Sequence, residues 1–190
     1  MVRRGASLIV LLLAGCTSVP LGYPDAWPPM QRLEANECPD LGGTYGEAGE
    51  TSSGCKAGEP CTNLSYGLFD GMVGFEDRAA LAGSKVELHQ PAAEELEIVV
   101  RDGDRERGRA SLSSEYGDFR CTPRGLTLLP RGGRVFIVGG SAYRELRTFN
   151  RATDGSLVML REALGSGEGA VVPVTPGARY WVRWAPRPAR

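Results

Sequence analysis

The chain has 190 residues, with 22 Lys or Arg and 23 Asp or Glu side chains, so its formal net charge at neutral pH is −1. Hydrophobic residues make up 42% of the sequence, which is enough for one domain with a substantial core. This length is hard to divide into two independent domains, and we expect no nucleic-acid partner.

The N-terminal stretch has the layout of a secretory signal. Arg3 and Arg4 form a short basic region, and residues 8–13 form an apolar run. This run is far shorter than the ~20 residues that a membrane-spanning helix needs. Small residues and Cys16 follow the run, as at a signal peptidase site. We therefore expect residues 1–15 to be a signal peptide that is removed.

The residues Leu13-Ala14-Gly15-Cys16 resemble the lipobox of bacterial lipoproteins. The resemblance implies that Cys16 receives a diacylglyceryl group, that cleavage occurs before it, and that its new amino group is acylated with a fatty acid such as palmitate. Two or more acyl chains would attach the protein to a membrane effectively permanently. Thr17 stands where an inner-membrane retention signal would have Asp, so the resemblance implies an outer-membrane anchor facing the periplasm. The alternative is an ordinary signal peptide with a chance cysteine.

The segment after Cys16 differs in composition from the rest of the chain. Residues 16–36 contain four prolines and no sustained period, so they predict a flexible, extended tether. Tyr23 and Trp27 are the two side chains there that could dock against the body. We place the globular domain at residues 37–190.

Four cysteines remain after lipidation of Cys16, and an even number in an exported protein indicates two disulfides. Cys55 and Cys61 bracket a short loop with Gly58 and Pro60, so we predict that they pair. That leaves Cys38 and Cys121 as the second pair. The other two pairings and an all-cysteine metal site are alternatives, but we expect no metal and no cofactor.

Short segments with strand patterns recur from residue 84 onward. The alternation in 85–90 and 95–102 predicts two strands, and Asp102-Gly103 predicts a hairpin turn. Residues 142–164 predict a long hairpin over Asp154-Gly155, although the first arm also fits a helical spacing. The other expected strands lie at 44–45, 108–114, 118–121, 125–129, 134–140, 170–174 and 179–184. Residues 46–63 predict a polar loop.

Helical signals are confined to residues 64–83, where 77–82 predict one or two turns. Eight to ten short strands with at most one short helix indicate an all-β protein, either an antiparallel barrel or a sandwich.

The charges are unevenly distributed along the chain. Residues 16–119 carry 8 Lys or Arg and 19 Asp or Glu, whereas residues 120–190 carry 12 Arg and 4 Asp or Glu. One explanation is that acidic and basic strands pair within the fold. The other is an Arg-bearing face for an anionic envelope polymer or lipid headgroup. The candidate for such a face is the strip formed by Arg179, Trp181 and Arg183, and its alternative is burial of the aromatic side chains.

The sequence contains no recognisable catalytic motif, so we name no catalytic residue. No serine lies in a nucleophile elbow, and there is neither an H-E-x-x-H motif nor a phosphate-binding loop. The single histidine, His89, follows Val86 and Leu88 and is expected at a solvent-exposed strand end. It could act as a general base with a carboxylate behind it. Glu95 and Glu97 would share a strand face, which favours a solvated surface over a catalytic pair.

The start of the domain resembles the G-x-W motif of lipocalins, with Tyr45 in the place of Trp after Gly43 and Thr44. This resemblance implies a barrel with an apolar ligand. The wider pattern, a lipobox followed by "CPDLGGTY" and a β-rich body ending in "YWVRW", is similar to small envelope lipoproteins of proteobacteria.

Our leading hypothesis is a non-enzymatic envelope lipoprotein that binds or assembles with another envelope protein or an anionic envelope polymer. A lipocalin-like carrier is the alternative, and a hydrolase with an unrecognised site is a remote one. A filled core would favour the first, and an apolar cavity the second.

Overall fold

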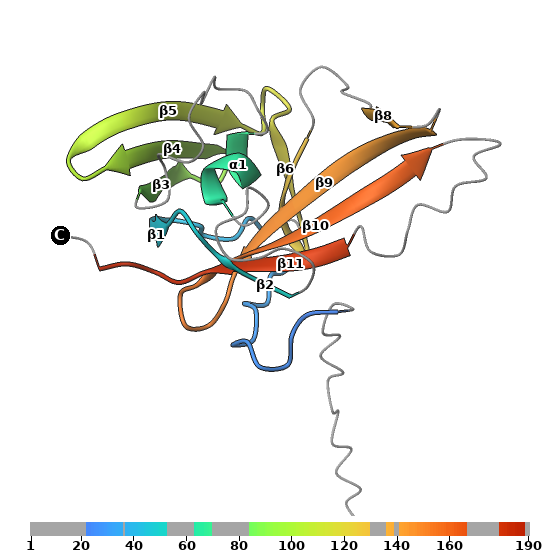
Figure 1. The fold of residues 1–190 in the computed structure, drawn as a ribbon, viewed down its shortest axis with the longest axis horizontal. Helices are drawn as coiled ribbons and strands as arrows, with labels where there is room; N and C mark the ends of the chain where they lie inside the picture. Colours follow the sequence, from blue (N-terminus) through green and yellow to red (C-terminus); the bar gives the residue numbers. More distant parts are fainter. Residues whose placement is uncertain are drawn as a thin grey trace, which may run out of the picture.

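A computed structural model describes residues 22–35, 37–52, 63–69, 84–129, 136–138, 141–166 and 179–188. These residues form two antiparallel sheets and one short helix, which confirms the predicted all-β class (Figure 1). The sheets do not close into a barrel, so the sandwich is the correct one of the two expected architectures.

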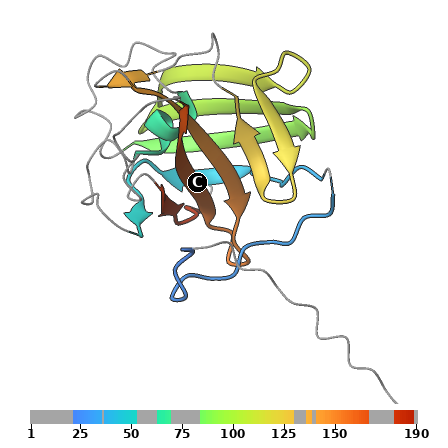
Figure 2. The same cartoon turned by 90° about the vertical axis from the view of Figure 1, so that its right-hand side faces the viewer.

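The smaller sheet has the strand order β1-β3-β4-β5, and the larger has the order β2-β11-β10-β9-β7-β6, with β8 paired to β9. In chain order the elements are β1 (Gly43–Gly46), β2 (Glu50–Thr51), α1 (Leu64–Phe69), β3 (Lys85–Ala92), β4 (Glu95–Asp102), β5 (Arg105–Ser113), β6 (Phe119–Thr122), β7 (Gly125–Leu128), β8 (Phe136–Val138), β9 (Ser141–Arg151), β10 (Leu157–Ser166) and β11 (Arg179–Trp184). In Figure 2 the green strands of the smaller sheet run across the view, while the brown strands of the larger sheet run steeply, so the two sheets cross at a large angle.

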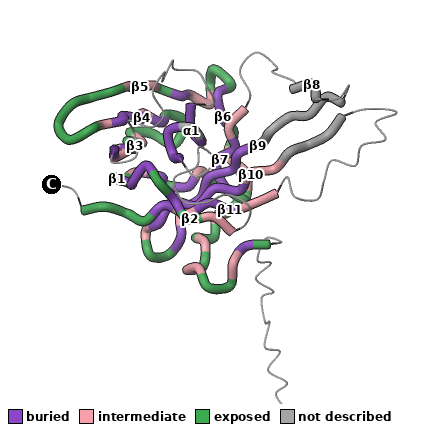
Figure 3. The backbone as a smooth tube through the Cα atoms, in the orientation of Figure 1, coloured by how far each residue is buried: buried purple, intermediate pink, exposed green. Residues whose placement is uncertain are grey.

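The alternation of side chains explains how each sheet contributes to the core. Val86 and Leu88 of β3 are buried inside the sandwich, and Glu87 between them faces outward. In β11 the side chains of Tyr180, Val182 and Trp184 face the main core, whereas Trp181 lies on the opposite face, as the alternation predicts. Figure 3 shows the buried residues concentrated where the two sheets overlap.

Two predicted hairpins are present. The turn at Asp102-Gly103 joins β4 to β5, and Gly103 adopts a positive φ of 60° that suits a residue without a Cβ. The turn at Asp154-Gly155 joins β9 to β10 in a continuous antiparallel register from Leu157↔Arg151 to Ser166↔Ala142. The first arm, which also fitted a helix, is therefore a strand.

The described helix lies in the segment 64–83, to which the helical signals were confined. It occupies Leu64–Phe69, directly after Asn63, a residue type that favours helix starts. The predicted turns at 77–82 lie outside the described residues, as does the expected strand at 170–174. Residues 46–63 were expected to form only a loop. The described part of this segment also contains the short strand β2, so the loop prediction is wrong there.

Helix α1 fills space between the two sheets (Figure 1). Leu64, Leu68 and Phe69 are at most 1% exposed and belong to the main core, together with residues from both sheets. Gly67 faces the larger sheet, since a Cβ there would approach Met159 Sδ at 3.4 Å. The sandwich interior at this point is therefore filled with protein side chains.

The N-terminal segment 22–35 is not a free tether. It lies on the outer face of the larger sheet. Met30 forms an isolated antiparallel β-bridge with Ala152 there, and Gln31 N donates a 2.8 Å hydrogen bond to Arg151 O. This corrects the flexible tether predicted for 16–36, as far as the described residues extend. The docking of Tyr23 and Trp27 that the sequence allowed does occur, because their rings lie 5.8 Å apart in the same small apolar cluster.

Candidate functional site

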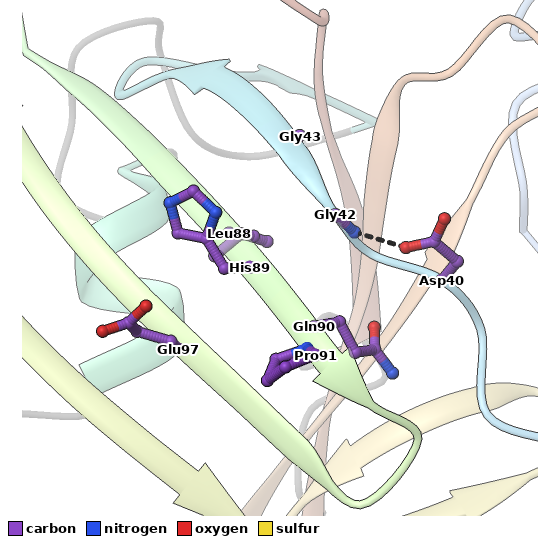
Figure 4. A pocket seen from close by; sticks show the side chains of 8 residues that line it. All are labelled: Asp40, Gly42, Gly43, Leu88, His89, Gln90, Pro91 and Glu97. Atoms are coloured by element: carbon purple, nitrogen blue, oxygen red, sulfur yellow. Dashed lines mark hydrogen bonds between the residues drawn. The ribbon is translucent and has the colours of Figure 1, made fainter.

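A shallow hollow lies at the end of β3, beside the start of β1. It has a volume of about 540 Å³ and is lined by Asp40, Gly42, Gly43, Leu88, His89, Gln90, Pro91 and Glu97 (Figure 4). The alternation of β3 points His89 out of the sheet, next to its cross-strand partner Glu97 on β4. The hollow thus contains the single histidine of the chain, which is solvent-exposed as predicted but lies within β3 and not at a strand end, because β3 continues to Ala92.

His89 has carboxylates nearby, but each is held by another partner. Its side chain is 56% exposed, and its Nε2 lies 4.0 Å from Glu87 Oε2. Glu87 is bonded more closely by Lys85 and Arg101, at 2.8 and 2.9 Å, and the Lys85 hydrogen bond is the main cause that lowers the pKa of Glu87. Glu97 forms an ion pair with Arg109. These contacts leave His89 without a carboxylate dedicated to it.

Asp40, at the other side of the hollow, has a structural role. Its Oδ1 accepts a 2.8 Å hydrogen bond from Gly42 N, and its Oδ2 lies 3.5 Å from Arg151 Nη1 (Figure 4). The carboxylate therefore shapes the entry into β1. The hollow lacks the nucleophile–base–orienter arrangement that a hydrolase site would require among its lining residues.

The outer face of the smaller sheet carries interleaved charges around this hollow. Arg109 pairs with Glu106 at 2.8 Å in addition to Glu97, and Arg107 lies 3.1 Å from Asp102. Val99 points to this outer face, between its cross-strand neighbours Glu87 and Arg109, yet it is only 1% exposed. The acidic and basic side chains on this surface thus pair with one another, which fits the solvated face inferred for Glu95 and Glu97.

The strip formed by Arg179, Trp181 and Arg183 lies on one face, but it is not an open binding surface. Trp181 is only 4% exposed. Arg179 Nη2 lies 2.5 Å from Glu162 Oε1, and Arg183 contacts Asp154 and Glu50 at 2.7 and 3.4 Å. Pairing of charges within the fold therefore accounts for these two arginines.

Trp181 is buried by the segment that precedes the domain. The ring of Tyr23 packs edge-on against it, with centroids 5.1 Å apart, and Val158, Leu160 and Ala152 complete the cluster. This cluster lies on the outer face of the larger sheet and is separate from the main core. The aromatic side chain predicted as a candidate contact for a ligand is instead a contact for the chain itself.

Of the predicted disulfides, one falls on described residues. Cys38 and Cys121 are joined, as predicted for this pair, with their Cα atoms 5.1 Å apart and their positions 83 residues apart in sequence. The bond connects the segment before β1 in the smaller sheet to β6 at the edge of the larger sheet. The predicted pair Cys55 and Cys61 and the lipidation residue Cys16 lie outside the described residues.

Glu47 is a buried carboxylate that the sequence analysis did not single out. It is fully buried and accepts hydrogen bonds from the backbone N of Ser65, at 3.2 and 3.3 Å, and from the Ser65 hydroxyl. Burial raises the pKa of Glu47, and the hydrogen bonds from Ser65 oppose this shift. Its position in a polar, glycine-rich stretch of sequence gave no signal of burial.

Arg147 and Asn150 of β9 are two further buried polar residues that the sequence did not reveal. Arg147 donates a 3.1 Å hydrogen bond to Gly67 O and so connects α1 to the larger sheet. Asn150 Nδ2 donates to Gln31 O and Arg124 O, at 3.3 and 3.2 Å. Both residues organise neighbouring backbone, and only the topology brings these partners together.

Two further observations concern the described part of the chain. It contains no group of three or more His, Cys, Asp or Glu side chains arranged to hold a metal ion. Its helix is too short to cross a membrane.

Comparison of the chain with known protein families, curated proteins and solved structures found no match.

Proposed function

We propose that the protein is a lipid-anchored envelope protein whose β-sandwich acts as a non-enzymatic binding or assembly module. Attachment through Cys16 is supported by the match of Leu13-Ala14-Gly15-Cys16 to a lipobox. The Cys38–Cys121 disulfide supports export, since such bonds persist in oxidising compartments outside the cytosol. The anchor would place the module at the outer membrane, facing the periplasm.

The observation that carries the choice of a binding module over a carrier is the filled interior beside α1. A lipocalin-like carrier needs an apolar cavity of several hundred Å³ between its strands. Here Leu64, Leu68 and Phe69 occupy the space between the sheets, and Trp184, Phe149 and Phe119 are at most 1% exposed around them. The described hollow at His89 lies on an outer face and has polar and charged residues in its lining. The partner would therefore contact a surface of the sandwich, and another envelope protein is the class we favour.

The anchor is tested by metabolic labelling of cells with a fatty acid. We expect label on the wild-type protein and none on Cys16→Ser, with the variant also retaining its signal peptide. The lipobox interpretation fails if Cys16→Ser is still labelled.

The choice between module and carrier is tested by extraction of the protein purified from envelope membranes. A binding module should release no stoichiometric apolar molecule apart from its own acyl groups and should cross-link to a protein in intact cells. A stoichiometric apolar ligand in the extract would favour the carrier instead.

A further inference from the structure

The docked segment 22–35, named the strap from here on, is attached to the other described residues by few hydrogen bonds. Among these residues, two backbone hydrogen bonds hold it, from Gln31 N to Arg151 O and from Thr153 N to Pro29 O, both 2.8 Å long. Asn150 adds a side-chain hydrogen bond of 3.3 Å to Gln31 O. Pro24, Pro28 and Pro29 have no N–H to donate to the sheet. A segment held by so few bonds can open at a low free-energy cost.

The apolar contacts of the strap are separate from those that hold the sandwich together. Tyr23, Trp27 and Met30 pack only in the outer cluster around Trp181, and no strap residue belongs to the main core. Trp27 and Met30 are only partly buried. Release of the strap would therefore expose one face of the larger sheet and leave the packing between the sheets unchanged.

One buried polar group on the covered face opposes docking of the strap. In the docked arrangement the indole Nε1 of Trp181, the ring against which Tyr23 packs, is buried and has no hydrogen-bond acceptor. Burying an N–H group without a partner is unfavourable, and water would satisfy this group once the strap is released. The strap is thus balanced between apolar packing that favours docking and a buried donor that favours release.

The disulfide sets how far release can proceed. Cys38 follows the strap and is bonded to Cys121 on β6, so detachment of the chain from its N-terminal side stops there. Tyr23 lies seven residues after Cys16 and Cys38 lies 22 residues after it. At ~3.4 Å per extended residue, the distance from Cys16 to the domain is limited to about 25 Å when the strap is docked and about 75 Å when it is released.

We propose that residues 22–35 form a releasable strap that opens independently of the sandwich, uncovers Trp181, and lengthens the reach of the domain from its membrane anchor. The opening itself depends only on the contacts above, whereas the change in reach rests on the proposed lipid attachment at Cys16. The docked state holds the outer face of the larger sheet near the anchor, and the released state lets the domain contact a partner farther from the membrane.

Hydrogen exchange on the purified mature protein tests the opening without reference to lipid. We expect the amides of Gln31 and Thr153 to exchange at least about tenfold faster than those of Val158 and Met159 in β10, through an opening with little dependence on denaturant. Equal rates with equal denaturant dependence would overturn the proposal, because the strap would then unfold only with the whole domain.

A pair of tyrosine variants tests which contacts control the release. Tyr23→Ala removes the ring that covers Trp181, and Tyr116→Ala removes a ring that is 86% exposed. Trypsin cleavage after Arg32 should be at least about tenfold faster in Tyr23→Ala and unchanged in Tyr116→Ala, since loss of a buried aromatic ring shifts an equilibrium by more than that factor. The thermal unfolding midpoint of the cleaved and uncleaved domain should stay close to that of wild type. A large fall in the midpoint of Tyr23→Ala, or equal cleavage of all three proteins, would overturn the proposal.

Neutron reflectivity of the mature protein on a supported phospholipid bilayer tests the reach. We expect the protein layer of Tyr23→Ala to extend farther from the bilayer than that of wild type or Tyr116→Ala. If the protein does not attach to the bilayer at all, the lipid anchor fails while the exchange and cleavage results still decide the opening. Attachment with identical layers for all three proteins would overturn the proposed change in reach.

Discussion

Cys38 and Cys121 connect the two sheets of the sandwich at one side of the main core, with their Cα atoms 5.1 Å apart. Both residues are partly buried and pack against that core. The bond joins chain positions 83 residues apart, and the entropy model of disulfides assigns about 4–5 kcal/mol to a loop of this length. The double variant Cys38→Ser/Cys121→Ser should therefore lower the free energy of unfolding by up to about this amount.

Urea unfolding followed by circular dichroism measures this loss. The wild-type protein under reducing conditions is the matched control and should approach the midpoint of the double variant. An unchanged midpoint would mean that the bond does not constrain the unfolded chain. Peptide mapping without reduction will also show whether Cys55 and Cys61 form the second predicted pair.

Gly125, at the start of β7, should not tolerate a side chain. Its φ is 137°, and a Cβ there would lie 2.0 Å from Phe149 O on the neighbouring strand. Gly117 also has a positive φ, 74°, but a Cβ there would have no atom within 4 Å. Gly125→Ala should therefore cost at least about 3 kcal/mol, whereas Gly117→Ala should cost about 1–2 kcal/mol from backbone strain alone. Chemical denaturation of both variants checks this difference, and equal losses would contradict the close approach of β7 and β9.

The strands were predictable from sequence because each depends on a local pattern. The alternation of Val86 and Leu88 places a strand in any sheet that has one buried face, and Asp102-Gly103 specifies a tight turn by its backbone preferences. The position of α1 was harder to predict. A six-residue helix shows less than two turns of periodicity, and it forms here because Leu64 and Leu68 fit between two sheets whose relative position no local pattern records.

What covers the candidate binding face could not be predicted for a related reason. The spacing of Arg179, Trp181 and Arg183 correctly predicted that they share one face, but spacing cannot show what covers it. Tyr23 lies far from Trp181 in sequence, and the two meet only because the strap docks on the outer face of the larger sheet. Likewise the polar sequence around Glu47 gave no indication that α1 would begin against its carboxylate.

Glu47 should make stability depend on pH in the opposite sense to an exposed ion-paired carboxylate. Burial raises the pKa of the Glu47 carboxyl in the folded state above its ordinary value, so the folded state binds the proton more tightly than the unfolded state. The resulting stabilisation is complete below the unfolded pKa and is lost as the pH rises through the folded pKa. Glu47→Gln cannot ionise and should lack this loss.

The free energy of unfolding of wild type and Glu47→Gln, measured between pH 4 and 8, checks this sign. The variant should gain stability relative to wild type as the pH rises, and the two curves should run parallel once Glu47 is fully ionised. Glu47→Ala is the control, because it leaves the backbone N of Ser65 without its acceptor and should cost about 1–3 kcal/mol. A difference between wild type and Glu47→Gln that does not change with pH would contradict the burial of an ionisable carboxylate.

The arginines of β11 provide a test of the two explanations for the uneven charge distribution. Arg183 bonds Asp154 at 2.7 Å and Ser156 Oγ at 3.1 Å, and Arg179 pairs with Glu162, so both are engaged within the fold. Because these pairs are partly exposed, Arg179→Gln/Arg183→Gln should cost only about 1 kcal/mol per residue or less in stability. Retention of this double variant on an anionic polymer such as heparin should match that of wild type at low and at physiological salt.

The matched control for the lost charge is the double variant Arg105→Gln/Arg107→Gln, which changes two exposed arginines of β5 in the smaller sheet. If only the β11 variant lost retention, with the largest difference at low salt where charges are screened least, the arginines would bind an anionic partner despite their internal pairs. Equal retention of all three proteins would leave pairing within the fold as the explanation for Arg179 and Arg183.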